Sequence, residues 1–389
     1  MTSFTGNWNY PTSVRFGAGR VNELGAACAE LGIRAPLVVT DPGLRALPLF
    51  ADVMEIAREA GLRAAAFSEI QGNPVEKNVT DGVLAYREAE CDGVIAFGGG
   101  SALDVAKAVA LMVGQARPLW DFEDVGDNWT RVDTAGMAPV VAVPTTAGTG
   151  SEVGRCSVVT DEAAHKKRLI FHPKMLPERV ICDPALTAGL PPALTAWVGM
   201  DALSHNLEAY LAPAFHPLAD GIAIEGMRLV ARSLIPAVRD GRDLEARASM
   251  MAASLMGATA FQKGLGAMHA LSHPVSVAVG SHHGLTNAIV MPYVMAWNEE
   301  VIAEKCDVLA RALSLAEPGF RGVQAWILGL REAIGIPHTL ADVGVTAAMA
   351  PELAPDAAAD PTAPTNPQPV AVDGFRTLYE RAVSGAVGG

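Results

Sequence analysis

The feature that most limits the fold of this chain is a change of pattern near residue 186. Before it, short apolar runs alternate with segments of helical periodicity, and after it long Ala-, Leu- and Met-rich segments take over. Alternation of that kind is typical of a mostly parallel sheet covered by helices on both faces. The sequence therefore predicts an α/β domain with a variant parallel sheet over residues 1–186 and an all-α domain over residues 187–389.

The apolar runs and their periodicity also give the expected elements. Strands are predicted at residues 35–40, 63–68, 93–97, 139–143 and 179–182. Helices are predicted at residues 49–61, 75–90 and 102–113 in the first half, and at 193–211, 219–237, 244–261, 265–279, 301–316 and 373–386 in the second. Residues 351–370 are rich in Pro, Ala and Asp, so we expect loops or short helical turns there.

Composition excludes several classes of function. The net charge of −13 argues against binding to nucleic acid or to an anionic membrane. No apolar stretch reaches the roughly 18 residues of a membrane span, and the N-terminus does not have the pattern of a signal peptide. The five cysteines are scattered without CxxC spacing, as expected for free thiols in a reducing compartment. We therefore expect a cytoplasmic protein.

Histidines are concentrated in two short segments of the second half. Five of the nine lie within residues 199–205 and 264–284. Asp201 and His205 are four residues apart, as are His269 and His273, and such pairs share one helix face. Two of these faces and a further histidine from the next segment could surround one divalent cation, and the mixed ligand set suits Fe(II), Zn(II), Ni(II) or Mn(II). The alternative is that the histidines are structural, because ligand-like pairs also occur by chance.

Three loops that follow predicted strands have the composition of a nucleotide site. The segment GGGS at residues 98–101 could let a diphosphate approach the backbone at the start of a helix, although alone it is a weak signal. Asp41 could accept hydrogen bonds from the adenosine ribose, which would favour NAD over NADP, or it could simply mark a turn. The segment TTAGTGSE at residues 145–152 closes another strand. Ligands bind at the carboxyl ends of such strands, so the three loops together predict a nucleotide crevice. The acidic residue precedes the glycine loop, so a variant of the usual dinucleotide fold is expected.

The motifs GGGS, PTTAGTGSE, GMDALSHNLEAY and GAMHALSHP, followed by HHG, occur in this order along the chain. In that combination the sequence resembles the iron-containing (group III) alcohol dehydrogenase family over essentially its whole length. The resemblance implies an N-terminal dinucleotide-binding domain and a C-terminal helical domain with a metal in the cleft between them, as in the dehydroquinate synthase-like superfamily. It also implies a homodimer or larger homo-oligomer.

Carried over position by position, the resemblance implies a set of site residues. The metal ligands are Asp201, His205, His269 and His283, with Fe(II) expected and Zn(II) or another divalent ion as alternatives. His283 is preferred to its neighbour His282 because the family's ligand directly precedes a glycine. His273 matches a histidine beside the nicotinamide and substrate, so it is the expected catalytic residue. The positions implied to bind NAD are Asp41, Asn73, Gly99, Gly100, Ser101, Asp104, Thr145, Thr146, Thr149 and Lys167.

These implications predict an NAD(H)-dependent oxidoreductase that interconverts a small alcohol and its aldehyde or ketone. Within that class, polyol oxidation of the glycerol dehydrogenase type and hydroxy-acid oxidation of the 4-hydroxybutyrate type both stay open. A lyase resembling dehydroquinate synthase would need several cationic residues near the ligands, and no such set is evident in the second half. A protein whose metal only clamps two helices would have no use for a nucleotide loop set.

Overall fold

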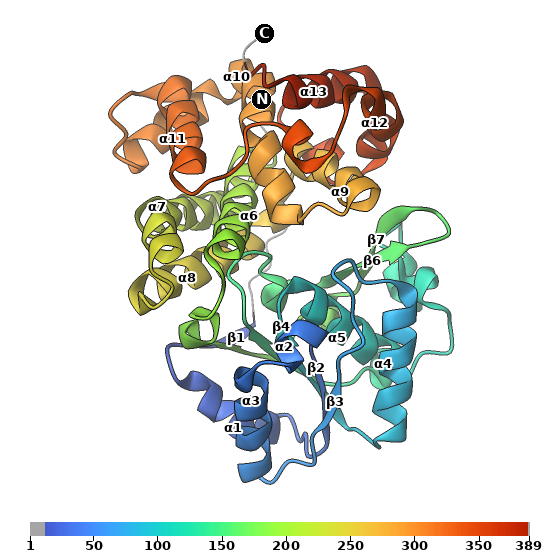
Figure 1. Ribbon diagram of the computed structural model, residues 1–389. Helices are drawn as coiled ribbons and strands as arrows, with labels where there is room; N and C mark the ends of the chain where they lie inside the picture. The colour runs from blue at the N-terminus through green and yellow to red at the C-terminus, as the bar shows by residue number, and fades with distance from the viewer. Residues whose placement is uncertain (1–11, 388–389) are drawn as a thin grey trace. The chain divides into compact units, whose positions relative to one another are not determined.

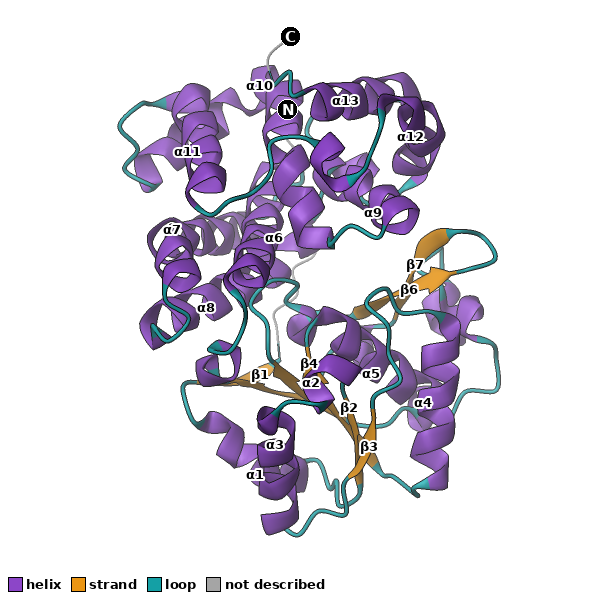
Figure 2. Ribbon diagram, viewed as in Figure 1, coloured by secondary structure: helices purple, strands orange, loops and turns teal. Residues whose placement is uncertain are grey.

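The computed structural model describes residues 12–387, which form two compact units. The first unit ends at Gly189 and the second begins at Leu190. Figure 1 follows the chain through both units, and Figure 2 shows that the strands belong to the first unit while the second is built of helices. The predicted fold class, an α/β half followed by an all-helical half, is thereby confirmed.

The first unit is built on a six-stranded sheet of order β1-β8-β5-β4-β2-β3, in which every neighbouring pair is parallel. Its strands are β1 (Ser13–Phe16), β2 (Pro36–Val39), β3 (Ala65–Phe67), β4 (Gly93–Gly98), β5 (Val140–Pro144) and β8 (Arg179–Cys182). All residues of β2, β4 and β5 are buried. A strand covered on both faces needs no polar side, which is why these strands appear as continuous apolar runs in the sequence.

Helices cover both faces of this sheet. They are α1 (Leu24–Glu30), α2 (Pro42–Arg45), α3 (Pro48–Glu59), α4 (Glu76–Glu88) and α5 (Gly100–Met112). On one face, α1 and α3 form an apolar core with inward residues such as Val38, Ile95 and Val141. On the other face α4 and α5 pack against the sheet and against each other. The nucleotide-type loops are therefore held on a rigid two-sided support.

An antiparallel hairpin adds to this unit and was not expected from the sequence. It consists of β6 (Cys156–Asp161) and β7 (Lys166–Phe171). Ser157 on β6 is buried and donates to the carbonyl of Asp104 on α5 over 2.8 Å. The outward side of β7 is polar, with Lys166 exposed. A strand of this kind gives no continuous apolar run, so the pattern of a fully buried strand does not predict it.

The second unit contains the remaining helices, which are α6 (Pro192–Leu211), α7 (Pro217–Arg239), α8 (Leu244–Ala260), α9 (Ala267–Val279), α10 (His283–Ala312), α11 (Gly319–Ala333), α12 (Ala350–Ala359) and α13 (Val372–Ser384). Helix α6 is its centre, because it packs against α7, α8 and α10. Every residue of α6 from Val198 to Leu211 is buried. Polar residues on such a helix must find partners inside the protein. Among the described helices none, including the 30-residue α10, is both long and apolar enough to cross a bilayer.

Two parts of the second unit differ from the sequence prediction. Helix α10 begins at His283 and not near residue 301, so it includes Pro292. The prediction of loop or short turns over residues 351–370 is wrong for its first part, which forms the ten-residue helix α12. Pro351 lies in the first turn of α12, where a missing N–H costs no helical hydrogen bond. Pro355 lies inside α12, so the helix forms despite a proline in its interior, and a high proline content did not exclude a helix here.

Candidate active site

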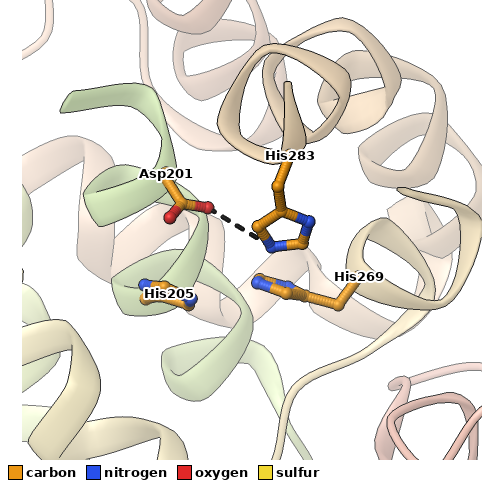
Figure 3. Close-up of side chains that lie close together, drawn as sticks. All are labelled: Asp201, His205, His269 and His283. Carbon is orange, nitrogen blue, oxygen red and sulfur yellow. Dashed lines mark ion pairs between the residues drawn. The ribbon is translucent and has the colours of Figure 1, made fainter. Parts of the chain in front are cut away.

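Four predicted ligands come together in the second unit. Asp201 and His205 lie one turn apart on α6, His269 lies in the first turn of α9, and His283 is the first residue of α10. Each offers one ligand atom, and these four atoms all lie within 4.8 Å of one another. Figure 3 shows the four side chains turned toward a common point, with Asp201 facing His283. Three are buried and His283 is partly buried, so the group is largely shielded from water.

Small residues allow the helices that carry these ligands to approach one another. A Cβ atom on Gly284 would lie 2.4 Å from the carbonyl oxygen of Trp197 and 2.9 Å from Cβ of Asp201. A Cβ on Gly257 of α8 would lie 2.9 Å from that of His205. Any side chain at either position would push a helix away from α6. Packing therefore requires a glycine after His283, because Gly284 lets the start of α10 lie against the turn of α6 that holds Asp201.

Three of the four ligands are oriented by a second residue. Glu208 uses one carboxylate oxygen for Nδ1 of His269, over 2.5 Å, and the other for the backbone N–H of Met268. The Ser272 hydroxyl lies 3.2 Å from Nδ1 of His283. The Asn287 side-chain amide donates to Asp201 over 3.0 Å. Partners at Nδ1 direct Nε2 of both imidazoles to the centre, where the Asn287 amide nitrogen lies 3.3 Å from that of His269 and 3.1 Å from that of His283. Such outer contacts raise affinity for a metal by fixing ring orientation.

The electrostatics of His269 also depend on Glu208. Burial alone would lower the pKa of His269, but the charge of Glu208 and its hydrogen bond raise the pKa above its ordinary value. In the absence of a cation, a proton on the ring is thus stabilised by the carboxylate. A divalent ion would displace a proton from the opposite ring nitrogen, so metal binding and proton release are coupled here.

The donor set itself fits a divalent cation. A carboxylate and three imidazoles suit Fe(II) and Zn(II), and no thiolate is present among the four. Asp201 is 2% exposed, and its side-chain oxygen accepts from one neutral amide, that of Asn287. A buried carboxylate with so little compensation is costly unless a cation or its equivalent faces it. The residues present therefore fit the metal that the resemblance implies.

His273 and His282 lie beside the four ligands and are not part of the group. The ring of His273 stacks on that of His283, with centroids 5.2 Å apart and an interplanar angle of 17°. His282 packs against Trp197, with centroids 5.2 Å apart. Of the two neighbouring histidines, the four-residue group thus includes His283.

In the first unit, the three predicted nucleotide loops follow β2, β4 and β5, which are consecutive neighbours in the sheet. Their carboxyl ends meet at one edge because all three strands are parallel. The N–H of Thr145 donates to the carbonyl of Gly98 over 2.9 Å. A Cβ on Gly98, whose φ is +152°, would lie 3.7 Å from a carboxylate oxygen of Asp41. Asp41, the glycine loop and the threonine loop thus lie next to one another at this edge.

The glycines of this surface are needed for close packing. A Cβ on Gly99 would lie 3.3 Å from the side chain of Thr146, and one on Gly100 would lie 2.6 Å from that of Thr149. Gly99 is the N-cap of α5 and offers no side-chain cap to its first N–H groups. The open amino end of a 13-residue helix, with its positive dipole, is suited to a diphosphate.

Several predicted cofactor side chains are engaged within the protein. One oxygen of Asp104 accepts from the Ser151 hydroxyl over 2.5 Å and the other accepts from the N–H of Val158 over 3.0 Å. The Ser101 hydroxyl donates to the carbonyl of Gly72 over 2.8 Å. Asp41 caps α2 by accepting from the N–H of Leu44 over 2.9 Å. Asp104 and Ser101 thus shape the loops, while their roles toward NAD stay predictions.

The last two predicted cofactor residues lie outside these three loops. Asn73 lies between β3 and α4, next to Gly72, whose carbonyl accepts from Ser101. Lys167 lies on β7, opposite Thr160 in the hairpin. A contact from either residue to NAD also stays a prediction.

Sequence reasoning missed the residues that orient the ligands and His273. Asn287 is four residues after His283 and Glu208 is seven after Asp201, spacings that share a helix face, so both could have been found by extending the same rule. Ser272 has no such spacing from His283. Asp360, which contacts His273, is 87 residues away and in a segment predicted as loop. No local pattern could have revealed it.

Comparison with known proteins agrees with this geometry. The sequence model of the family "Iron-containing alcohol dehydrogenase" matches residues 11–184, and that of "Fe-containing alcohol dehydrogenase family, C-terminal" matches residues 195–383. Together these matches span both units. The chain therefore belongs to the iron-containing alcohol dehydrogenase family, whose members use NAD and a divalent metal, usually iron.

Individual relatives share the whole length of the chain. A 4-hydroxybutyrate dehydrogenase of Cupriavidus necator is 40% identical over 96% of this chain and 99% of its own length. An NAD-dependent methanol dehydrogenase of Bacillus methanolicus is 35% identical over 97% of this chain and all of its own. A solved structure of 1,3-propanediol oxidoreductase superposes with a TM-score of 0.92 at 34% identity, over 97% of this chain and all of the other. The fold prediction is confirmed by this similarity.

Proposed function

We propose that Asp201, His205, His269 and His283 hold one divalent metal ion, and that on it the protein interconverts a small alcohol and its aldehyde or ketone with NAD(H). The observation that carries this proposal is the convergence of the four ligand atoms within 4.8 Å inside a buried, oriented group. The reaction also needs a binding site for the dinucleotide, and we propose the glycine- and threonine-rich edge of the first unit for it.

The chain's own residues would perform the following work. Asp201 and the three imidazoles hold the ion, and Glu208, Ser272 and Asn287 fix their orientation. When bound, the ion supplies Lewis acidity at the substrate oxygen and NAD accepts the hydride. His273, packed against His283 beside the group, would accept the alcohol proton, which then leaves to solvent.

Among substrates, we propose a primary alcohol that carries a second polar group, with 4-hydroxybutyrate as the first candidate. This choice is supported by the 40% identity to a 4-hydroxybutyrate dehydrogenase, compared with 35–36% for relatives described as methanol and 1,3-propanediol dehydrogenases. We further expect a homo-oligomer in the cytoplasm, which light scattering after gel filtration and cell fractionation would test.

The experiment that tests the function is a substrate panel with protein purified without oxygen and analysed for bound metal. 4-Hydroxybutyrate, 1,3-propanediol, 1-butanol, glycerol and methanol are each mixed with NAD, and NADH absorbance is followed. We expect NADH formation with alcohols, and the highest kcat/KM with 4-hydroxybutyrate. Absence of NADH with every alcohol, or conversion of a substrate without net NADH, would contradict the proposed oxidoreductase. A preference for a neutral alcohol would refute only the substrate.

Coenzyme choice is tested by Asp41→Gly. We propose that this carboxylate, beside Gly98 at the sheet edge, also accepts from the adenosine ribose and repels a 2′-phosphate. Its loss should raise kcat/KM for NADPH several-fold relative to NADH, and replacement of the α2 cap by glycine should destabilise the protein by only about 0.3 kcal/mol. An unchanged NADH/NADPH ratio with the same loss of stability would mean that Asp41 is a helix cap only.

A further inference from the structure

A carboxylate from a distant segment contacts His273. Asp360 directly follows α12, and its Oδ2 lies 2.7 Å from Nδ1 of His273 on α9. Both side chains are nearly buried, with 12% of His273 and 9% of Asp360 exposed. Helices α9 and α12 pack against each other, so the pair is part of a packed interface inside the second unit.

The other oxygen of Asp360 is fixed by its own loop. Oδ1 accepts from the backbone N–H of Thr362 over 2.9 Å and from the Thr362 hydroxyl over 2.6 Å. Burial would raise the pKa of Asp360, but His273 and the Thr362 donors lower it to about 2. Both oxygens of the carboxylate thus face hydrogen-bond donors, so the carboxylate accepts from His273 and the hydrogen of that ring lies on Nδ1.

The ring of His273 is held on its faces as well as at Nδ1. It stacks on His283 at 5.2 Å and meets His269 edge-on at 6.1 Å. These contacts prevent the ring from turning, so only Nε2 is left to accept a hydrogen bond. A histidine fixed in one tautomer beside a metal group has the arrangement of a proton acceptor whose third partner sets its orientation.

We infer that Asp360 is a positioning residue for the dehydrogenase reaction, because it holds His273 in the Nδ1–H tautomer and presents Nε2 as the acceptor for the alcohol proton. This inference rests on the proposed role of His273. It assigns a function to the loop after α12, which contains no predicted site residue.

The decisive variant is Asp360→Asn. Thr362 donates to Oδ1, so the asparagine oxygen is retained at that position and its NH₂ group faces His273. An NH₂ group donates, so Nδ1 must become the acceptor and the hydrogen must move to Nε2. The matched control is Asp356→Asn, at an exposed aspartate of α12 four residues before Asp360. Asp360→Ala, which leaves the tautomer unconstrained, is the second variant if Asp360→Asn does not fold.

Two quantities are measured: the protonated nitrogen of His273, by NMR, and the kcat. In zinc-loaded protein with ¹⁵N-labelled histidine, one-bond couplings identify the protonated nitrogen of His273, whose signals are assigned from a His273→Gln spectrum. We expect the hydrogen on Nδ1 in the wild type and on Nε2 in Asp360→Asn. The kcat for alcohol oxidation should fall roughly tenfold or more, while bound zinc and the KM for the alcohol change little.

The outcomes separate the inference from the proposed function. If His273→Gln retains wild-type turnover, the role of His273 is wrong and the inference falls with it. If His273→Gln is slow while Asp360→Asn turns over at the wild-type rate, Asp360 does not act through His273 and only the inference is overturned. An Asp360→Asn spectrum with the hydrogen still on Nδ1 also overturns it. Unchanged behaviour of Asp356→Asn assigns the effect to the contact with His273.

Discussion

The two units prepare their sites in opposite ways. In the helical unit the functional groups are side chains, and these are buried and oriented by other side chains, as Glu208 orients His269. In the sheet unit the side chains at the loop edge mostly bond to neighbouring segments of the same unit, as Asp104 on α5 does with Ser151 and Val158. What this edge offers to a ligand is therefore backbone, a helix end and shape.

This difference teaches where each site is vulnerable. A site made of side chains loses function when a donor atom is removed, and it is sensitive to the partners of those atoms. A site made of backbone loses function when an atom is added, because nothing at it can move aside cheaply. Substitutions that delete atoms should be severe in the helical unit, and substitutions that add atoms should be severe in the sheet unit.

The largest expected effect is that of His269→Ala, which deletes a donor atom. The Lewis acidity of the ion lowers the activation barrier by several kcal/mol, so turnover should fall about a thousandfold or more when the ion is lost. Bound metal, measured by elemental analysis, should be lost with it, whereas NADH binding followed by fluorescence should be retained. His338→Ala, at an exposed histidine of the same unit, is the control. An active, metal-free His269→Ala protein would show that the site of the helical unit does not depend on its side-chain donor atoms.

The next effect concerns buried carboxylates, which the two units treat differently. Both oxygens of Glu208 are engaged, whereas one oxygen of the equally buried Glu152 has no hydrogen-bond partner among the described residues. Burial raises the pKa of Glu152 to about 7, against attraction from its own backbone N–H and from Lys107. The folded state therefore prefers the neutral form of Glu152.

The sign of the resulting pH dependence follows from proton binding. Between pH 4.5 and about 7 the folded state holds a proton on Glu152 that the unfolded state has lost, so this group lowers stability as pH rises through that window. Glu152→Gln should match the wild type near pH 4.5 and exceed it at pH 8 by up to about 3 kcal/mol in unfolding free energy. Urea unfolding at both pH values measures this, with the exposed Glu162→Gln as control. Equal stability at pH 8 would mean that Glu152 is ionised without cost.

A third effect sharpens the role of outer partners in the helical unit. Glu208→Gln keeps an oxygen for the N–H of Met268 but replaces the acceptor at Nδ1 of His269. Metal affinity should fall by about 10- to 100-fold. Competition with a chelator measures the affinity, and the absorption of cobalt-loaded protein reports the changed ligand field. The control is Glu225→Gln, at an exposed glutamate on α7. Unchanged affinity would show that the packing of α9, and not Glu208, orients His269.

More of the fold than of the site could be predicted from the sequence alone. The buried strands β2, β4 and β5 were predictable because burial on both faces leaves continuous apolar runs, and the pairs on α6 and α9 follow from helix geometry. The hairpin β6–β7 and helix α12 were missed because one has a polar side and the other contains prolines. Contacts such as Asp360 with His273 depend on how distant helices pack, which no local spacing encodes.

The smallest effect tests the sheet unit by adding a single methyl group. In Gly100→Ala the new Cβ would lie 2.6 Å from Cγ2 and 3.0 Å from Oγ1 of Thr149. Thr149 is β-branched and has few rotamers to escape into, so the helix start or the threonine loop must shift, at a cost of about 1 kcal/mol or more. The KM for NAD should rise about fivefold or more, with bound metal unchanged. Gly221→Ala, an exposed helical glycine with no atoms near its Cβ position, controls for the substitution itself. A Gly100→Ala protein with a wild-type KM for NAD would show that the loop yields easily, and the contrast between a rigid backbone site and a side-chain site would no longer hold.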